Sequence, residues 1–182
     1  MLSTDYNFIY IHIPKTAGTS ISKKLGGFDR LERGVQDHRT IKELEPLTPG
    51  DWLHIISSGK FKNREKLLFN RLVRHRFLVP QDMPTREQYH NYFKFTFVRN
   101  PWSRVYSWYK NVLRDPIHRE KQGVPEGCSF SDFINHHMDQ SALFPQTWWI
   151  KNWQGEIPLD FIGKFEKLQE DLRKLISNGN PI

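Results

Sequence analysis

The sequence predicts an α/β fold, a three-layer sandwich in which a mainly parallel central sheet is flanked by helices. Two nearly continuous apolar runs, residues 7–13 and 92–98, have the length and character of strands covered on both faces. A proline-containing polar turn follows each run, and apolar residues at helical spacing follow each turn. Strands that alternate with helices in this way are typical of parallel sheets.

The first strand–turn–helix unit begins with a strand from Asn7 to Ile13. Pro14 ends the pairing of that strand, because proline has no backbone N–H to donate. Thr19 or Ser20 is the expected cap of the helix that follows. We expect this helix to stop at the glycine pair 26–27.

The second unit follows a less regular segment. We expect a strand over residues 53–57 and a basic amphipathic helix over residues 60–76. The second clear strand is YFKFTFV, residues 92–98. Asn100 is then a good N-cap and Pro101 a good first helical residue.

The C-terminal third is predicted from its turn residues and leucine spacing. Residues 115–128 hold two prolines and two glycines and are expected to form a loop. A short helix over residues 130–138, capped by Ser129, should follow. A late strand over residues 160–165 and a helix over residues 166–176 complete the pattern.

The composition bounds the class of protein. The chain has 182 residues, 37% of them hydrophobic, and a net charge of +7, which favours an anionic ligand or partner. Nucleic acid, a phosphorylated cofactor, an acidic glycan and a membrane surface all remain open. Cys128 is the one cysteine, so the chain can form no intrachain disulfide. The start lacks the pattern of a signal peptide, and no apolar run approaches the roughly 18 residues of a membrane span. We therefore expect a soluble, cytoplasmic protein without stable membrane insertion.

The first turn, within IYIHIPKTAGTSI, carries the residues of an oxyanion site. Lys15 supplies a full charge, and Gly18 allows close approach of the backbone. Thr16, Thr19 and Ser20 supply hydroxyl groups beside a helix start, which favours anions. A plain strand-to-helix turn has the same composition and stays an alternative. The Walker A pattern does not fit, because no Gly-Lys-Ser/Thr triplet is present.

The second turn, within FVRNPWSRVYSWY, repeats this arrangement with an arginine. Arg99 directly follows the strand, and Ser107 lies two helical turns further on. Together they can hold a second anionic group through a forked charged contact and a hydroxyl. The alternative makes Arg99 a salt-bridged strand end and Ser107 a surface residue. Two such turns in one basic domain favour a ligand with two separated anionic groups.

The stretches HIPKTAGTS and FKFTFVRNPWSRVYSWY resemble the two signatures of PAPS-dependent sulfotransferases, most closely the carbohydrate-type branch in its soluble bacterial form. The resemblance implies a P-loop-NTPase-like fold and the cofactor PAPS, 3′-phosphoadenosine 5′-phosphosulfate. It implies that Arg99 and Ser107 bind the 3′-phosphate. It also implies a 5′-phosphosulfate site formed by Lys15, Thr16, Ala17, Gly18, Thr19 and Ser20. The late stretch DFIGKFEKLQEDL is similar to a third family stretch, with Lys164 where arginine is common.

The activity expected from this resemblance is in-line transfer of a sulfuryl group from PAPS to an acceptor hydroxyl on a carbohydrate, with PAP as product. Neither a metal nor nucleic acid is expected to take part. Lys15 should stabilise the bridging oxygen. His38 is the first choice for the base that accepts the hydroxyl proton, with Asp37 and Glu43 as alternatives. His12 is expected to be structural, and His118 is expected on the surface.

Two other functions stay open: a phosphotransferase with a degenerate P-loop, and a non-enzymatic binder of polyanions. Trp148, Trp149 and Trp153 form either a packed cluster or a platform for a ring. The basic stretch 60–76 is either a solvated helix face or a flank for an acidic acceptor.

We expect a single domain over residues 1–182. Family members often continue with a basic, aromatic segment near the cofactor. The chain ends before such a segment, and three explanations stay open: a truncated sequence, a flexible lid that was left out, or a shortened and inactive protein. The sequence predicts neither the identity of the acceptor nor the oligomeric state.

Overall fold

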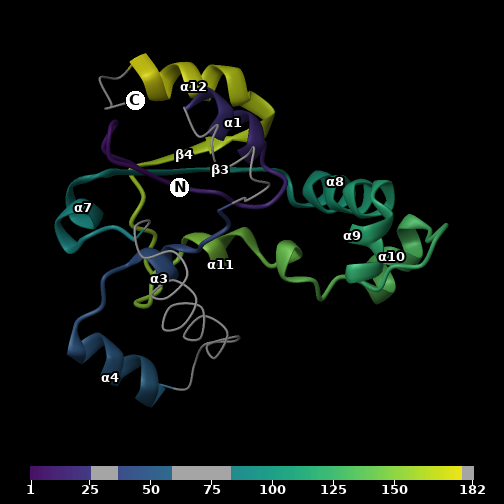
Figure 1. Cartoon of the computed structure of the whole chain (residues 1–182), viewed down its shortest axis with the longest axis horizontal. Coiled ribbons are helices and arrows are strands. Elements are labelled where there is room, and N and C mark those ends of the chain that lie inside the picture. Colours follow the sequence, from purple (N-terminus) through teal and green to yellow (C-terminus); the bar gives the residue numbers. More distant parts are fainter. Residues whose placement is uncertain (26–36, 59–82, 178–182) are drawn as a thin grey trace.

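A computed structural model of the chain describes residues 1–25, 37–58 and 83–177 (Figure 1). Four strands of this part form one sheet in the order β1–β2–β3–β4. They are β1 (Leu2–Ser3), β2 (Phe8–Ile11), β3 (Phe93–Val98) and β4 (Phe161–Lys164). β1 runs antiparallel to β2, whereas β2, β3 and β4 are parallel to their neighbours. The expected α/β fold with a mainly parallel sheet is confirmed.

Helices cover both faces of this sheet because successive strand residues point to opposite sides. Phe8, Tyr10, Phe95 and Phe97 pack against α1 (Gly18–Lys24) and α12 (Leu168–Ser177). Ile9 and its neighbours on the opposite face pack against α3 (Ile41–Leu44), α7 (Arg86–Asn91) and α11 (Gln146–Ile150). Figure 1 shows α1 and α12 on one side of the strands and α3 and α11 on the other.

A third apolar cluster lies beyond the end of β3. It joins α8 (Pro101–Arg114), α10 (Phe130–His136) and the 3₁₀ helix η3 (Ser141–Leu143), with Val105, Val112 and Phe133 at its centre. The helix α9 (Pro116–Lys121) lies beside α8 in Figure 1. The 3₁₀ helix η4 (Phe165–Lys167) connects β4 to α12. This cluster supports α8 as one wall of the site described below.

Three local predictions are wrong. Residues 53–57 belong to the helix α4 (Pro49–Ser58), because a short apolar run does not distinguish a strand from a helix. The expected loop 115–128 contains α9, whose first two free amides donate to the side chain of Asp115. The N-cap of α1 is Ala17 in a left-handed conformation, with no side-chain cap, rather than Thr19 or Ser20.

Other predicted boundaries are confirmed within a few residues. Asn100 caps α8 with Pro101 at its first position, and Ser129 caps α10. The predicted stop at the glycine pair 26–27 and the predicted helix 60–76 lie outside the described residues. β1, α3, α7 and α11 were not predicted. No helix in the three described ranges combines the length and the apolar character needed to cross a membrane.

Candidate functional site

The ends of β2 and β3 meet at one edge of the sheet. The two strands are parallel neighbours, and Ile11 pairs with Thr96. The turns after them therefore touch: Arg99 donates from Nη1 to the backbone carbonyl of Lys15 at 3.2 Å. The carboxyl ends of parallel strands are where ligands commonly bind in α/β folds.

A cleft with two lobes opens at this edge. The inner lobe, of about 690 Å³, is lined by both turns, by His12 and His38, and by one face of α8. The outer lobe, of about 670 Å³, extends along α8. The two lobes share five residues, namely Lys15, Arg99, Ser107, Asn111 and Arg114. Each volume lies within the range of small-molecule sites.

Lys15 stands where the lobes meet. Its φ of 69° and that of Ala17, 68°, turn the loop sharply through the left-handed region. The Lys15 ammonium donates to Oδ1 of Asn111 at 3.0 Å. Burial lowers the pKa of Lys15, and the nearby Arg114 and Arg99 lower it further. The site thus concentrates positive charge that an anion would stabilise.

The rest of the first turn is divided between the cleft and the core. Ala17, Gly18, Thr19 and Ser20 line the inner lobe. Contrary to expectation, the side chain of Thr16 is fully buried, and its hydroxyl donates to the carbonyl of Ile13 at 2.9 Å.

The position of the His12 side chain requires a glycine at position 18. A Cβ atom at position 18 would lie 1.7 Å from Nε2 of His12. The close approach that we expected between Gly18 and a ligand is therefore also an approach to the imidazole of His12, which is itself buried.

Arg99 is held from several sides. Its backbone N–H donates to the side chain of Gln146 at 2.9 Å, and that side chain donates back to the Arg99 carbonyl at 2.7 Å. The guanidinium carbon lies 4.0 Å from the ring centroid of Phe165. Burial lowers the pKa of Arg99, while Glu166 acts against this. Within the described part of the chain, Nε of Arg99 is buried without a hydrogen-bond partner, so an acceptor atom from a ligand would satisfy it.

One face of α8 completes the cleft. Ser107, Asn111 and Arg114 follow at helical spacing and line both lobes. Asn111 donates from Nδ2 to Nδ1 of His118 at 3.2 Å, and His118 lines the inner lobe rather than standing apart on the surface. The sequence interpretation missed Asn111 and Arg114, although their spacing of four and seven residues from Ser107 indicated a shared face.

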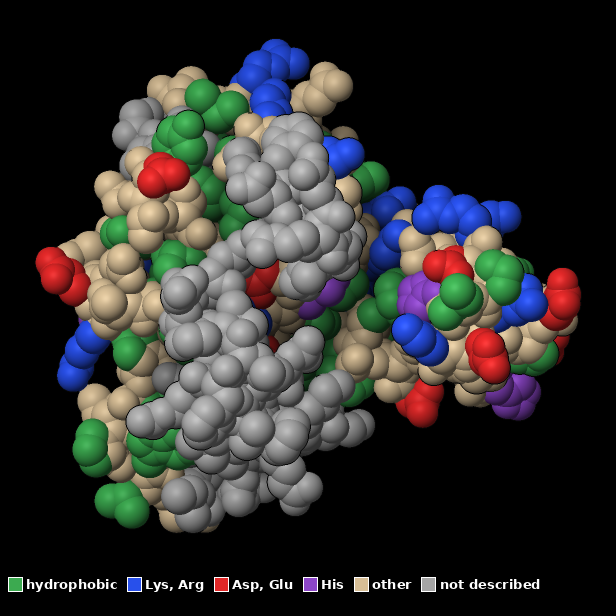
Figure 2. All heavy atoms as spheres, in the orientation of Figure 1, with side chains coloured by type: hydrophobic (Ala, Val, Ile, Leu, Met, Phe, Trp, Pro, Cys, Tyr) green, Lys and Arg blue, Asp and Glu red, His purple; other side chains and the backbone are tan. Residues whose placement is uncertain are grey.

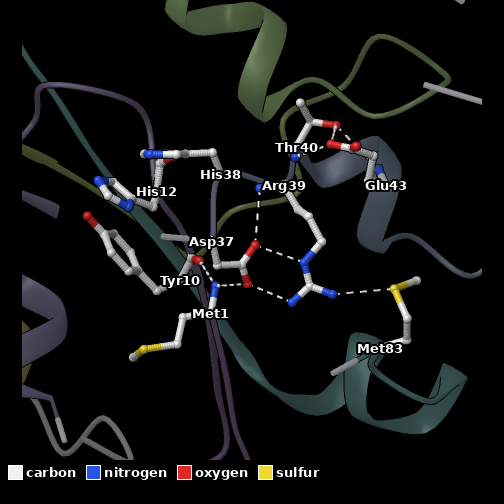
Figure 3. A network of polar contacts seen from close by, with 9 residues as sticks. All are labelled: Met1, Tyr10, His12, Asp37, His38, Arg39, Thr40, Glu43 and Met83. Carbon is white, nitrogen blue, oxygen red and sulfur yellow. Dashed lines mark hydrogen bonds and ion pairs between the residues drawn. The ribbon is translucent and has the colours of Figure 1, made fainter. Parts of the chain in front are cut away.

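His38 also lines the inner lobe, and its ring centroid lies 4.2 Å from that of His12 (Figure 3). Its Nδ1 lies 3.2 Å from the carbonyl oxygen of His12. Because a carbonyl only accepts, Nδ1 carries the hydrogen, and the neutral ring keeps its lone pair on Nε2. Burial is the main cause that lowers the pKa of His38, although the hydrogen bond to His12 and the charge of Asp37 oppose it. A neutral imidazole of this kind can accept a proton.

The two carboxylates considered as alternatives are engaged elsewhere (Figure 3). Asp37 pairs with Arg39 at 2.6 Å and with the ammonium of Met1 at 3.1 Å. Burial would raise the pKa of Asp37, but these two cations hold it well below its usual range. Glu43 accepts from the backbone N–H of Thr40 at 2.7 Å in a capping box. Neither carboxylate lines either lobe.

Trp149 and Trp153 do not form the platform for a ring considered above, and Lys164 does not reach the cleft. Trp149 and Trp153 are 5% and 2% exposed, and Trp153 donates to the carbonyl of Lys42 at 3.1 Å. Packing therefore accounts for these rings. From the stretch FIGKFE, Phe165 reaches the cleft, whereas Lys164 is exposed and does not line it.

The charge of the cleft is one-sided. Lys15, Arg99, Lys110 and Arg114 line it, and no carboxylate of the described residues does so. The described ranges also contain no group of three or more His, Cys, Asp or Glu side chains that could hold a metal ion. Charge of one sign in a concave site attracts ligands of the opposite sign.

Comparisons with known proteins bear on this cleft. Residues 1–180 match the model of the sulfotransferase family. The chain is 22% identical to carbohydrate sulfotransferase 14 of Mus musculus and of Homo sapiens, over 97% of this chain and 45% of each relative. It is 31% identical to an uncharacterized protein of Archaeoglobus fulgidus, over 50% of this chain and 70% of that relative. The chain thus spans less than half the length of the mouse and human relatives. No solved structure matches it.

Proposed function

Because the chain belongs to the sulfotransferase family, we propose that it transfers a sulfuryl group from PAPS to an acceptor hydroxyl on a carbohydrate. The observation that carries this proposal is the convergence of Lys15 and Arg99, from two strand ends, on one basic cleft without a carboxylate in its described lining. The carbohydrate is suggested by the names of the mouse and human relatives.

The residues of the cleft fit a nucleotide with two separated anionic groups. In the proposal, Lys15, Ala17, Gly18, Thr19 and Ser20 surround the 5′-phosphosulfate, since these five line the inner lobe. Thr16 shapes the turn through its bond to Ile13 instead of offering its hydroxyl.

The 3′-phosphate would be held by Arg99 and Ser107, which line both lobes. The buried Nε of Arg99 and its guanidinium stacked on Phe165 support this role. A guanidinium that is already oriented loses less conformational entropy when it forms charged hydrogen bonds.

The chain's own residues then have distinct tasks in the reaction. When bound, PAPS supplies the sulfuryl group and a phosphate leaving group. Lys15 stabilises the negative charge that develops at the leaving oxygen. His38 accepts the proton of the acceptor hydroxyl on Nε2, while its Nδ1–H stays on the carbonyl of His12 and keeps the ring oriented.

The test is transfer of labelled sulfate from PAPS to a library of carbohydrates, with and without a chelator of divalent ions. We expect a labelled product in both conditions and PAP as the second product. Lys15→Met is the control for the catalytic site. Magnesium-dependent transfer of phosphate from ATP, without sulfate transfer, would favour the phosphotransferase instead.

A further inference from the structure

We propose that Gln146, the first residue of α11, is a positioning residue that directs the guanidinium of Arg99 toward the 3′-phosphate of a nucleotide. The inference rests on the proposed function, because it takes Arg99 as the group that binds this phosphate. It goes further in one respect: it assigns the selectivity for a 3′-phosphate in part to a side chain that lines neither lobe of the cleft.

The side chain of Gln146 binds both polar groups of one backbone residue. Its Oε1 accepts from the N–H of Arg99 at 2.9 Å, and its Nε2 donates to the carbonyl of Arg99 at 2.7 Å. The last residue pair of β3 and β4 is Val98 with Lys164, so Arg99 lies just beyond the paired residues. The amide of Gln146 replaces a neighbouring strand at that point. Two bonds to one residue fix both of its planar peptide groups, and with them the direction in which its side chain leaves the backbone.

The guanidinium of Arg99 depends on this support. Its Nη1 donates to the carbonyl of Lys15 at 3.2 Å, the long end of the usual range, and within the described part of the chain its Nε has no hydrogen-bond partner. The ring of Phe165, with its centroid 4.0 Å from the guanidinium carbon, contacts one face of the group. A forked contact with a phosphate needs two N–H groups aimed at two oxygens. A small rotation of the Arg99 backbone would therefore misdirect the contact.

Charge alone does not select Arg99 as the phosphate site. Lys15, Lys110 and Arg114 line the cleft as well. Figure 2 shows Lys and Arg side chains gathered along the upper edge of the part formed by α8, α9 and α10. Such a distribution attracts an anion to the whole region. A preference for a nucleotide with a 3′-phosphate then depends on the direction of the Arg99 guanidinium, which Gln146 controls.

The helix α11 gives Gln146 a firm base. Trp149 and Ile150, at the other end of this helix, are buried in the apolar cluster on the Ile9 face of the sheet. Trp149 also meets the ring of His38 edge-on, with the ring centroids 6.4 Å apart. Side chains on packed elements hold a geometry more precisely than side chains on loops. The contact between Gln146 and Arg99 is therefore well suited to orient a binding residue.

The experiment measures the preference for PAP over AMP, which lacks the 3′-phosphate, by calorimetric titration. Gln146→Leu removes both bonds at similar volume. It should weaken PAP binding about threefold to tenfold and change AMP binding by less than about twofold. Gln88 in α7 provides the matched control, because it is also half-buried and its Oε1 accepts from the backbone N–H of Thr85 at 2.9 Å. Gln88→Leu should leave both affinities unchanged.

A double-mutant cycle shows whether Gln146 acts through Arg99. In an Arg99→Ala background no guanidinium remains to be directed, so adding Gln146→Leu should not weaken PAP binding further. An equal loss in the two backgrounds would overturn the inference, as would a Gln146→Leu variant with the wild-type preference for PAP. Equal losses of PAP and AMP affinity would also overturn it, because they would show general damage to the site.

Hydrogen exchange in the wild-type chain tests the contact without any substitution, so the inference stays testable if Gln146→Leu does not fold. The backbone amide of Arg99 should exchange at least about tenfold more slowly than the same amide in an unstructured peptide. Exchange at the unstructured rate would overturn the inference. Equal affinities of the wild type for PAP and AMP would instead count against the proposed function, whatever the exchange rate of this amide.

Discussion

Gly18→Ala should destabilise the protein by driving a methyl group into the imidazole of His12. The added Cβ would lie 1.7, 1.9 and 2.3 Å from three atoms of that ring. Tyr10, on which the ring stacks at 5.8 Å, and His38, whose ring lies 4.2 Å away, block its movement on two sides, and the residue is 5% exposed. Overpacking of this kind costs about 1–3 kcal/mol. For a chain of this size, the unfolding temperature should fall by about 2–12 °C.

A double-mutant cycle measured by thermal and denaturant unfolding identifies the cause. In a His12→Ala background the clash is absent. The loss of unfolding free energy caused by Gly18→Ala should therefore be smaller in that background than in the wild type, by about 1 kcal/mol or more. Equal costs in the two backgrounds, or a Gly18→Ala variant as stable as the wild type, would refute the contact between position 18 and His12.

Three further predictions concern single side chains. Lys15→Met should lower kcat/KM for PAPS-dependent transfer about 10²- to 10³-fold while the unfolding temperature stays the same; a tenfold effect or less would argue against charge stabilisation by Lys15. His38 acts in its neutral form and its pKa is lowered by burial, so activity should persist below pH 6.5 and be lost as pH falls through the lowered pKa. His38→Gln should abolish this acid limb of the pH–activity profile. An unchanged profile would exclude His38 as the base. Arg104 is buried and donates to the carbonyls of residues 142–144. Arg104→Met should therefore lower the free energy of unfolding, measured with denaturant, by about 3 kcal/mol. A loss below about 1 kcal/mol would show that these bonds matter little.

The sequence predicted those parts of the fold in which local signals agree. An apolar run of strand length, Asn100 as cap and Pro101 as first residue all indicated β3 followed by α8, and the structure confirms that unit. Asp115 and Pro116 carry the same cap-and-proline signal for α9. The nearby prolines and glycines indicate a loop and conceal this signal in the sequence. The run at residues 53–57 was misassigned because its few apolar residues fit either period.

The candidate site, like the fold, was predicted only in part from the sequence. The resemblance to sulfotransferases is confirmed by the family model, and Lys15 and Arg99 were singled out from their positions after strands. That these turns share a cleft depends on β2 and β3 being neighbours, which sequence spacing does not determine. The direction of a side chain is set by packing, so the inward turn of Thr16 and the bond between Lys15 and Asn111 were beyond prediction.

The central claim is that Arg99 binds the 3′-phosphate of a nucleotide whose 5′-phosphosulfate lies at Lys15. Calorimetric titration with PAP and with AMP, which lacks the 3′-phosphate, tests it most directly. We expect PAP to bind about 10- to 100-fold more tightly than AMP, and Arg99→Ala to remove that preference. The exposed Arg173 of α12 provides the control, and Arg173→Ala should keep the preference. Equal affinities for PAP and AMP in the wild type, or an undiminished preference in Arg99→Ala, would contradict the account.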